Sequence, residues 1–207
     1  MSDSHLAVPE LGGVEIHGMT RSAFIVKGAL TAGAVYGAAT VGPFVGQALA
    51  QGGGDVDIVN FALTLEYLEA DFYKKGQSLG LSSAVMKLAK EFGDAETQHV
   101  DALTQTVKKL GGTPAAKPTF VFPIKDEKSF LSLAQTLEDT GVSAYNGAAP
   151  QIQSKDVLGA AGSIVQIEAR HAAAIRLQTS QAPAPDAFDK SLMKAAVLKA
   201  VKPLIKA

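Results

Sequence analysis

The chain has 207 residues, enough for one domain with a sizeable hydrophobic core and for additional extensions. Its formal net charge of −1 gives no electrostatic reason to expect a nucleic-acid partner. The absence of cysteine excludes disulfides, iron–sulfur clusters and thiolate zinc sites. Alanine, glycine and leucine dominate and tryptophan is absent, which favours a helical bundle over a sandwich of strands.

Residues 1–50 differ from the rest of the chain and are typical of an export signal or a membrane anchor. The stretch from Ala29 to Ala50 holds no charged residue, and residues 48–50 (Ala-Leu-Ala) form a small-x-small cleavage pattern. We therefore expect export to the periplasm or cell envelope. One alternative is an uncleaved anchor, with membrane association through residues 23–50. The other is an Ala/Gly-rich helix packed on its own protein, which would be compatible with a cytoplasmic chain.

Four helical segments are predicted between residues 55 and 180, because capping residues open each one and Gly or Pro closes it. They run from Asp55 or Asp57 to about Gly76 or Gly80, from Ser82 or Ser83 to Gly111, from Asp126 to Gly147, and from Ser154 or Asp156 to before Pro183. Only a few residues join the first segment to the second and the third to the fourth. This spacing predicts two antiparallel helical hairpins.

The stretch from Gly111 to Lys125 joins the two hairpins and contains three prolines. At roughly 3.3 Å per residue it reaches about 50 Å, whereas a helix of about 28 residues is about 42 Å long. The connection can therefore cross the whole bundle; a flexible linker between antiparallel helices is the alternative. Residues 181–207 form a C-terminal extension, in which we expect a short helix from Phe188 to Lys199 that Pro203 stops.

A repeat at an offset of 72 residues relates the two hairpins. The tripeptide Thr-Leu-Glu at residues 64–66 recurs at residues 136–138, and in both copies a tyrosine follows the glutamate after seven residues. Glu66, Tyr73, Glu96 and His99 thus recur as Glu138, Tyr145, Glu168 and His171. Four carboxylates and two imidazoles in this order are the ligand set of a dinuclear metal site inside a four-helix bundle.

Both Glu-x-x-His pairs lie in the middle of an apolar stripe. At 100° per residue, five apolar residues fall within about 40° of Glu96: Val85, Ala89, Phe92, Leu103 and Val107. Buried ionised carboxylates cost on the order of several kcal/mol each unless they are paired or metal-bound. The sequence therefore predicts metal ligation by Glu66, Glu96, His99, Glu138, Glu168 and His171. The alternative is a set of buried Glu and His residues satisfied by hydrogen bonds without metal.

Three further residues accompany these ligands. Glu69 lies nearer than Glu66 to the apolar stripe of the first helix, but its partner in the 72-residue register is Gly141. We treat Glu69 as an alternative ligand or as a second carboxylate near the site. Tyr73 and Tyr145 each lie within about 20° of the preceding Glu and two turns away. They are interpreted as core aromatics with a hydroxyl partner, or as catalytic phenols beside the metal ligands.

With these residues in view, the chain resembles the ferritin-like superfamily, and more narrowly the exported bacterial ferritin-like proteins related to plant desiccation-related proteins. The resemblance covers about Asp55 to Gln178, and residues 137–148 (LEDTGVSAYNGA) are its most specific match. It implies an all-α fold, with a ferritin-like four-helix bundle of two antiparallel hairpins and a long crossover, followed by a C-terminal helix. It also implies a dinuclear iron or manganese site, with Glu66 and Glu138 as single carboxylates and the Glu-x-x-His residues as paired ligands.

Carboxylates with one imidazole per metal suit iron or manganese better than a structural zinc site. We expect two iron ions as cofactors, with two manganese ions as the alternative, and dioxygen or peroxide as the reaction partner. The leading hypothesis is a di-iron oxidoreductase of the cell envelope that oxidises Fe(II) or scavenges peroxide. Alternatives are a di-manganese catalase-like protein and a non-enzymatic, metal-braced protein of the stress response. A homo-oligomer is compatible with the sequence.

Overall fold

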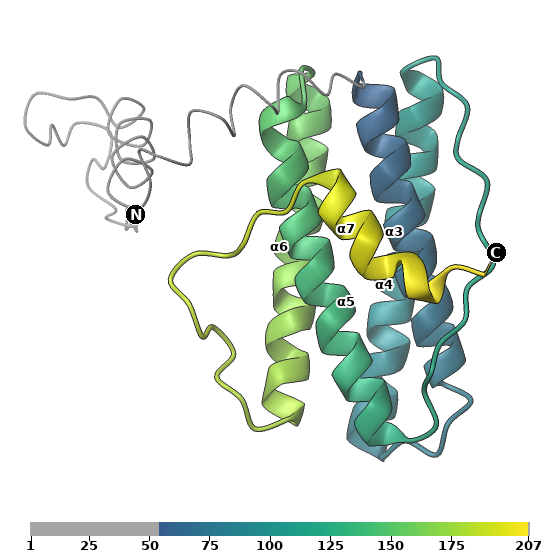
Figure 1. The fold of residues 1–207 in the computed structure, drawn as a ribbon, viewed down its shortest axis with the longest axis vertical. Coiled ribbons are helices and arrows are strands. Elements are labelled where there is room, and N and C mark those ends of the chain that lie inside the picture. Colours follow the sequence, from purple (N-terminus) through teal and green to yellow (C-terminus); the bar gives the residue numbers. More distant parts are fainter. Residues whose placement is uncertain (1–53, 207) are drawn as a thin grey trace, which may run out of the picture. The chain divides into compact units, whose positions relative to one another are not determined.

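The computed structural model describes residues 54–206, so the expected export or anchor segment at residues 1–50 lies outside the described residues. The helices are α3 (Asp55–Gly76), α4 (Ser83–Lys109), α5 (Glu127–Ala148), α6 (Lys155–Gln178) and α7 (Lys194–Val201). Helices α3 and α4 form one hairpin and α5 and α6 the other, and the four helices pack as a bundle (Figure 1). The predicted all-α, ferritin-like bundle with an additional C-terminal helix is confirmed. Across residues 54–206, no helix combines the length and the apolar character that a membrane span requires.

Most helix starts follow the predicted caps. Ser154 Oγ accepts a hydrogen bond from the backbone N–H of Val157 at 3.3 Å, and Asp126 and Ser129 form a reciprocal capping box. The start of α3 differs from the prediction, because Gly54 occupies its N-cap position without a side-chain bond. The Asp55 carboxylate instead accepts the backbone N–H groups of residues 153 and 154, each at 2.8 Å. It therefore ties the start of one hairpin to the turn of the other.

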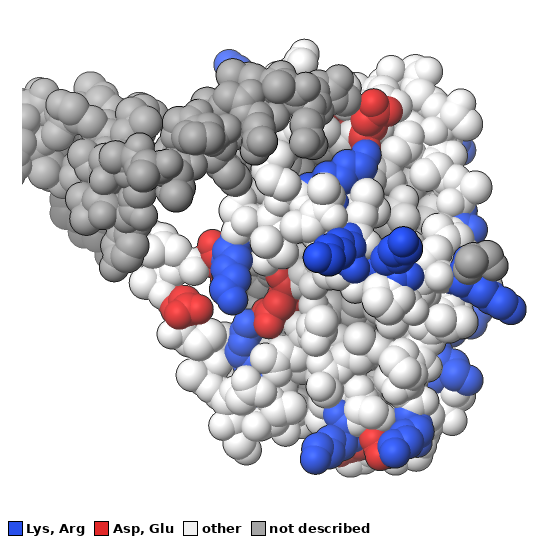
Figure 2. All heavy atoms as spheres, viewed as in Figure 1, with Lys and Arg blue, Asp and Glu red and all other residues white. Residues whose placement is uncertain are grey.

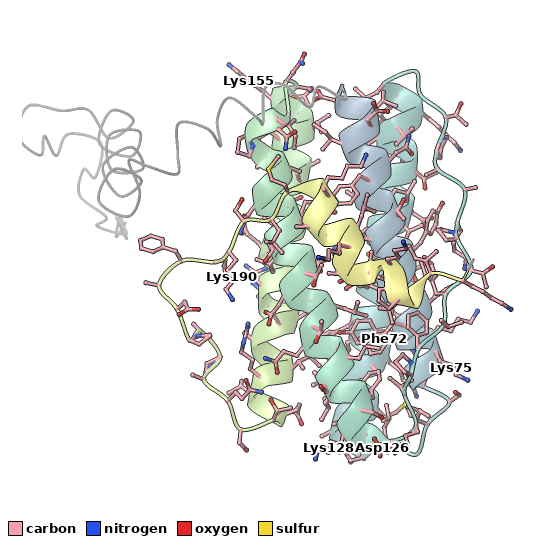
Figure 3. All side chains as sticks on the ribbon, in the orientation of Figure 1. Phe72, Lys75, Asp126, Lys128, Lys155 and Lys190 are labelled. Carbon is pink, nitrogen blue, oxygen red and sulfur yellow. The ribbon has the colours of Figure 1, made fainter. Side chains whose placement is uncertain are left out.

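The connection between α4 and α5 runs along the length of the bundle (Figure 1). Its first part is held by Asn60 of α3, whose amide oxygen accepts from the backbone N–H of Ala115 at 2.7 Å. Its last part is held by Phe122, whose ring meets that of Phe72 edge to face at 5.5 Å between centroids. Phe72 is labelled in Figure 3. Both contacts bind the connection to the bundle, so the long crossover is the observed arrangement and a loose linker is not.

Helix α7 crosses the outside of the bundle in front of α3 and α5 (Figure 1). It buries Val197 and Val201 against the main hydrophobic core, and the following backbone pairs with the crossover through a bridge between Phe120 and Ile205. Lys and Arg side chains are spread over the face of the bundle that α7 crosses (Figure 2). The C-terminal segment thus packs on the bundle through one apolar side and leaves a basic side exposed.

The predicted C-terminal helix begins too early, since residues 188–193 are not helical. Their backbone bonds to α5 instead: Leu192 N–H donates to the Ser143 carbonyl at 2.9 Å, and the Asn146 amide donates to the Lys190 carbonyl at 3.2 Å. A Cβ atom at Gly147 would lie 2.0 Å from the Leu192 carbonyl oxygen. The close approach that Gly147 permits therefore competes successfully with helix formation in this segment.

The buried residues form two clusters. The first is rich in aromatic rings and includes Phe72, Tyr73, Phe92 and Phe130. The second is mainly aliphatic and includes Leu63, Leu103, Val107, Tyr145 and Val157. Each cluster contains one of the two repeat-related tyrosines. The polar residues between these tyrosines therefore lie between an aromatic cluster on one side and an aliphatic cluster on the other.

Candidate metal centre

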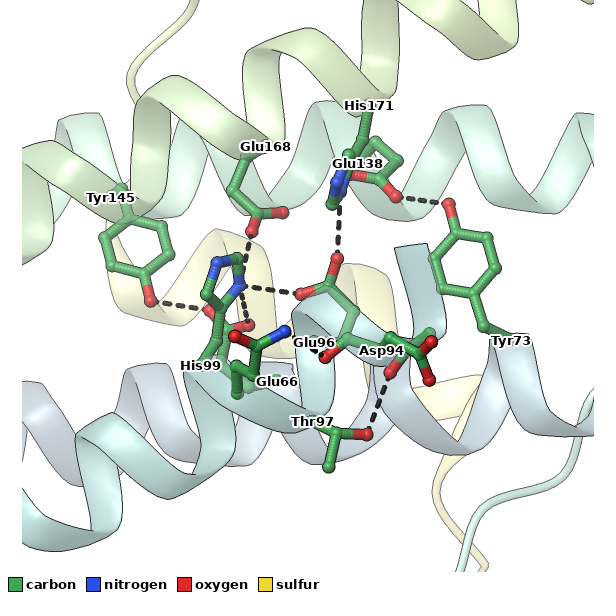
Figure 4. A network of polar contacts seen from close by, with 12 residues as sticks. Glu66, Tyr73, Asp94, Glu96, Thr97, His99, Glu138, Tyr145, Glu168 and His171 are labelled. Atoms are coloured by element: carbon green, nitrogen blue, oxygen red, sulfur yellow. Dashed lines mark hydrogen bonds and ion pairs between the residues drawn. The ribbon is translucent and has the colours of Figure 1, made fainter. Parts of the chain in front are cut away.

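All four helices of the bundle contribute to one buried polar cluster. It contains Glu66 from α3, Glu96 and His99 from α4, Glu138 from α5, and Glu168 and His171 from α6 (Figure 4). The four glutamates are 0% exposed and His171 is 5% exposed. The structure therefore brings together all six carboxylate and imidazole residues of the 72-residue repeat. All but the half-buried His99 lie in the interior, where ionised groups are most costly.

The two imidazole nitrogens are surrounded by carboxylate oxygens from several helices. His99 Nδ1 lies 2.9 Å from Glu96 Oε2, 3.1 Å from Glu66 Oε2 and 3.2 Å from Glu168 Oε1. His171 Nδ1 lies 2.9 Å from Glu96 Oε1 and 3.5 Å from Glu138 Oε2. One ring nitrogen carries at most one proton, so it cannot donate to three carboxylates at once, whereas a cation can attract all of these atoms.

The cluster divides into two overlapping groups, each able to surround one cation with ligand atoms that lie within 4.8 Å of one another. Glu66 and His99 belong to the first group, and Glu138 and His171 belong to the second. Glu96 and Glu168 belong to both groups. The two oxygens of Glu96 face different imidazoles, which is the geometry expected of a carboxylate that bridges two metal ions.

The hydrogen bonding of the cluster is incomplete in a way that fits metal ions. Several buried atoms of the cluster lie close to one another but have no partner in hydrogen-bonding geometry: Glu96 Oε1, Glu138 Oε2, His171 Nδ1 and both oxygens of Glu168. Buried polar atoms are nearly always paired. Among residues 54–206, no Lys or Arg forms an ion pair with these carboxylates. The donor set and its unpaired atoms therefore fit two divalent cations, which would balance the four carboxylate charges.

The pKa values of the cluster reflect burial together with the close pairs. Burial raises the pKa of Glu66 to about 7, although the hydrogen bond with His99 opposes this shift. Burial also raises the pKa of Glu96, but the close contacts with the His171 and His99 imidazoles outweigh it and bring the pKa to about 2. Burial lowers the pKa of His99, yet its contacts with Glu168, Glu66 and Glu96 raise it to about 12. The carboxylates thus strongly favour a positive charge at this point.

Each tyrosine bonds the single carboxylate of the other hairpin. The Tyr145 hydroxyl on α5 donates to Glu66 Oε1 on α3 at 2.6 Å, and the Tyr73 hydroxyl on α3 donates to Glu138 Oε1 on α5. The two phenols lie at opposite ends of the network (Figure 4). Burial raises the pKa of both phenols well above the usual range, so each remains a proton donor. The tyrosines thus fix the outer oxygen of each single carboxylate, as the interpretation with hydroxyl partners predicts.

Glu69 lies beside the cluster but belongs to neither four-residue group. It is 2% exposed, and its Oε2 atom has no hydrogen-bond partner. A Cβ atom at Gly141 would be 3.2 Å from Glu69 Oε1 and 3.2 Å from Glu168 Oε2. Glycine at position 141 therefore leaves room for the carboxylate of Glu69. In the sequence, this arrangement is visible as a break in the 72-residue repeat, where Glu69 corresponds to Gly141.

These features define a four-helix bundle with a buried cluster of carboxylates and imidazoles that could hold metal ions, and comparison with known proteins agrees on the fold. The ferritin-like domain family matches residues 54–181, and the chain belongs to this family. The structure is similar to that of a conserved hypothetical protein from Mycobacterium tuberculosis, with 18% sequence identity and a TM-score of 0.57, over 70% of this chain and 99% of that one. At this identity the likeness establishes the fold alone. No curated protein matches the chain.

Proposed function

We propose that the protein binds a pair of iron ions between its four helices and oxidises Fe(II) or scavenges peroxide or dioxygen there. The observation that carries the proposal is the overlap of two four-residue groups in the shared carboxylates Glu96 and Glu168. Oxygen and imidazole donors of this kind suit iron or manganese. Such a metal pair would supply two electrons to one molecule of dioxygen or peroxide.

The protein's own residues would have distinct parts in this chemistry. Glu66 and His99 would hold one ion and Glu138 and His171 the other, and the two shared carboxylates would help to hold both. The tyrosine hydroxyls orient the two single carboxylates by hydrogen bonds. Burial of the ligands excludes bulk water, which strengthens the electrostatic interactions within the site.

The first experiment is an anaerobic Fe(II) titration of the purified full chain, followed by exposure to oxygen. We expect uptake of two irons per chain and then an absorption band of an oxidised di-iron pair. Elemental analysis of protein from its native host would distinguish the metals: manganese, together with oxygen release from peroxide, would support the catalase-like alternative. No metal as isolated and no uptake on titration would overturn the proposal.

The second experiment removes the two shared carboxylates with Glu96→Gln and Glu168→Gln together. We expect loss of both irons, because neither group retains its bridging ligands. The matched control is Glu91→Gln, also on α4, whose side chain is 55% exposed and pairs with Lys87 at 3.7 Å. A lower melting temperature in the double variant, with no turnover in the parent protein to lose, would favour a metal that only braces the bundle.

We also propose that the protein acts in the cell envelope. The support is the uncharged stretch from Ala29 to Ala50, which ends in a cleavage-like pattern. Expression of the full chain in a bacterium, followed by cell fractionation and N-terminal sequencing of the product, tests this. Cleavage after residue 50 indicates export, a full-length product in the membrane fraction indicates an anchor, and a full-length cytoplasmic product contradicts the proposal.

A further inference from the structure

A small, partly open apolar cavity lies between the four helices next to Tyr145, and we propose that it is a docking site for dioxygen beside the residues that would hold the metal ions. This inference rests on the proposed function, because it names the oxidant that the site would receive. The cavity has a volume of about 20 Å³, and all four helices line it. Residues on its wall include Leu65, Leu103, Tyr145, Val157 and Ala161.

The wall of the cavity offers nothing that would hold water. It presents no polar surface, although Thr106 and Tyr145 are among its residues. The Thr106 hydroxyl donates to the Ala102 carbonyl at 2.8 Å, and the Tyr145 hydroxyl donates to Glu66 at 2.6 Å. A buried water needs about two to four polar partners, and apolar cavities stay dry and bind small apolar molecules or xenon. The chemistry of the wall therefore favours a small apolar occupant.

The size of the cavity narrows the choice of occupant. A single water needs roughly 10–15 Å³ of such space, so about 20 Å³ accommodates a diatomic molecule. Pockets for organic ligands are commonly about 300–1,000 Å³, far larger than this cavity. Hydrogen peroxide would lose its hydrogen bonds to water on entering this cavity, because the wall offers no polar groups to replace them. Among the oxidants of the proposed reaction, dioxygen is the one that fits.

The position of the cavity connects it to one end of the metal centre. Leu65 directly precedes Glu66, and Leu103 lies one helical turn after His99. The ring of Tyr145 forms part of the wall while its hydroxyl bonds Glu66 (Figure 4). One phenol side chain therefore spans the distance from the cavity to a carboxylate of the first four-residue group, which makes this end the entry side for dioxygen.

The other end of the centre is enclosed by packed rings. Around Tyr73 lie Phe72, Phe92 and Phe130, with ring centroids 5.2, 5.7 and 6.0 Å from its own. Phe92 also stacks on His171 at 3.9 Å. Tyr73 itself is 1% exposed. Because aromatic rings fill the space around Tyr73, we place the bound dioxygen at the Tyr145 end.

Xenon binding tests the cavity without any metal. Crystals of the full-length, metal-free protein are pressurised with xenon, and we expect a xenon atom in contact with Leu103 and Tyr145. A cavity that remains empty under xenon, or that contains ordered water, would overturn the proposal. Because the measurement needs no iron, it can succeed or fail independently of the proposed function.

Filling the cavity tests its role in oxidation. Ala161→Leu adds three carbons at the wall, and we expect it to slow the reaction with dioxygen severalfold in stopped flow. In that reaction two Fe(II) become two Fe(III), while O2 takes two electrons and two protons to give H2O2. The reaction with peroxide, in which two Fe(II), H2O2 and two protons give two Fe(III) and two waters, should keep its rate.

The matched control is Ala173→Leu on the same helix. Ala173 lines a separate cavity of about 370 Å³ whose wall includes charged residues such as Asp139, Arg176 and Lys190. This control should leave both rates unchanged. If Ala161→Leu fails to fold, Ala161→Val replaces it. Equal slowing with both oxidants, unchanged rates with both, or slowing in the control alone would overturn the assignment, while failure to load iron would overturn the proposed function instead.

Discussion

The two ends of the candidate metal centre have the same kinds of side chain but different surroundings. Tyr73 and Tyr145 occupy equivalent positions in the 72-residue repeat, and each donates to the single carboxylate of the opposite hairpin. Tyr73 is enclosed by aromatic rings, whereas Tyr145 borders a small apolar cavity. The repeat therefore gives both ends the same carboxylate, imidazole and phenol groups, while the residues around them differ from one end to the other.

Removing one single carboxylate at a time separates the two ends and has the largest expected effect. Glu66→Gln should abolish metal binding at the Tyr145 end and Glu138→Gln at the Tyr73 end, because each belongs to only one group. Each variant should retain about one iron per chain, since the other group keeps all four ligands. Iron counts by elemental analysis check this. Loss of both irons in either single variant would mean that the two positions are not independent.

Opening the aromatic end should cost the most folding stability. Phe130 is 0% exposed and stacks on Phe72 at 4.9 Å. Phe130→Ala should lower the free energy of unfolding by about 3–5 kcal/mol, through lost burial and the cavity that remains. The control Phe188→Ala removes a ring that is 80% exposed, so its effect should stay within about 0.5 kcal/mol. Denaturant titrations of the metal-free proteins measure both; a small loss for Phe130→Ala would show that this end can collapse.

The helices and the six clustered side chains could be predicted because their signals are present in the sequence itself. Periodicity and caps are local patterns that indicate the helices, and the 72-residue repeat singles out the side chains that cluster. The crossing of the tyrosine hydrogen bonds could not be predicted, since it depends on how α3 and α5 face each other. The same holds for Asp55, which bonds a distant turn instead of capping its own helix.

The cavity beside Tyr145 and the late start of α7 also depend on contacts between distant segments. Residues 188–193 have a sequence compatible with a helix, but their backbone bonds to α5. Likewise, no pattern in the sequence distinguishes a tyrosine that borders a cavity from one enclosed by rings. The repeat even suggests equal surroundings, so the asymmetry of the two ends becomes visible only in three dimensions.

Removing the hydroxyl of each tyrosine should lower the free energy of unfolding by different amounts at the two ends, and both losses should be smaller than that of Phe130→Ala. Tyr73→Phe leaves Glu138 Oε1 without its donor inside the aromatic cluster, and we expect a loss of about 1–3 kcal/mol, typical of an unsatisfied buried group. Tyr145→Phe should cost only about 0.5–1.5 kcal/mol, because the cavity beside the Tyr145 ring leaves room for the packing to adjust. Thermal or chemical unfolding of the metal-free variants decides this. Equal losses would contradict a difference in packing between the ends.

The smallest effect concerns the break in the repeat at Gly141. Alanine is intrinsically more favourable than glycine within a helix by about 1 kcal/mol, and the exposed control Gly159→Ala on α6, where a Cβ would meet nothing within 4 Å, should gain about that much. At Gly141 the added Cβ would instead press on Glu69 and Glu168 at 3.2 Å. We expect Gly141→Ala to lose most of this gain and to weaken iron binding, because Glu168 belongs to both four-residue groups. If Gly141→Ala gains the full stability and keeps its iron affinity, the Glu69 and Glu168 side chains can move away from the added Cβ without cost. Glu69 would then not be held in one position beside the centre.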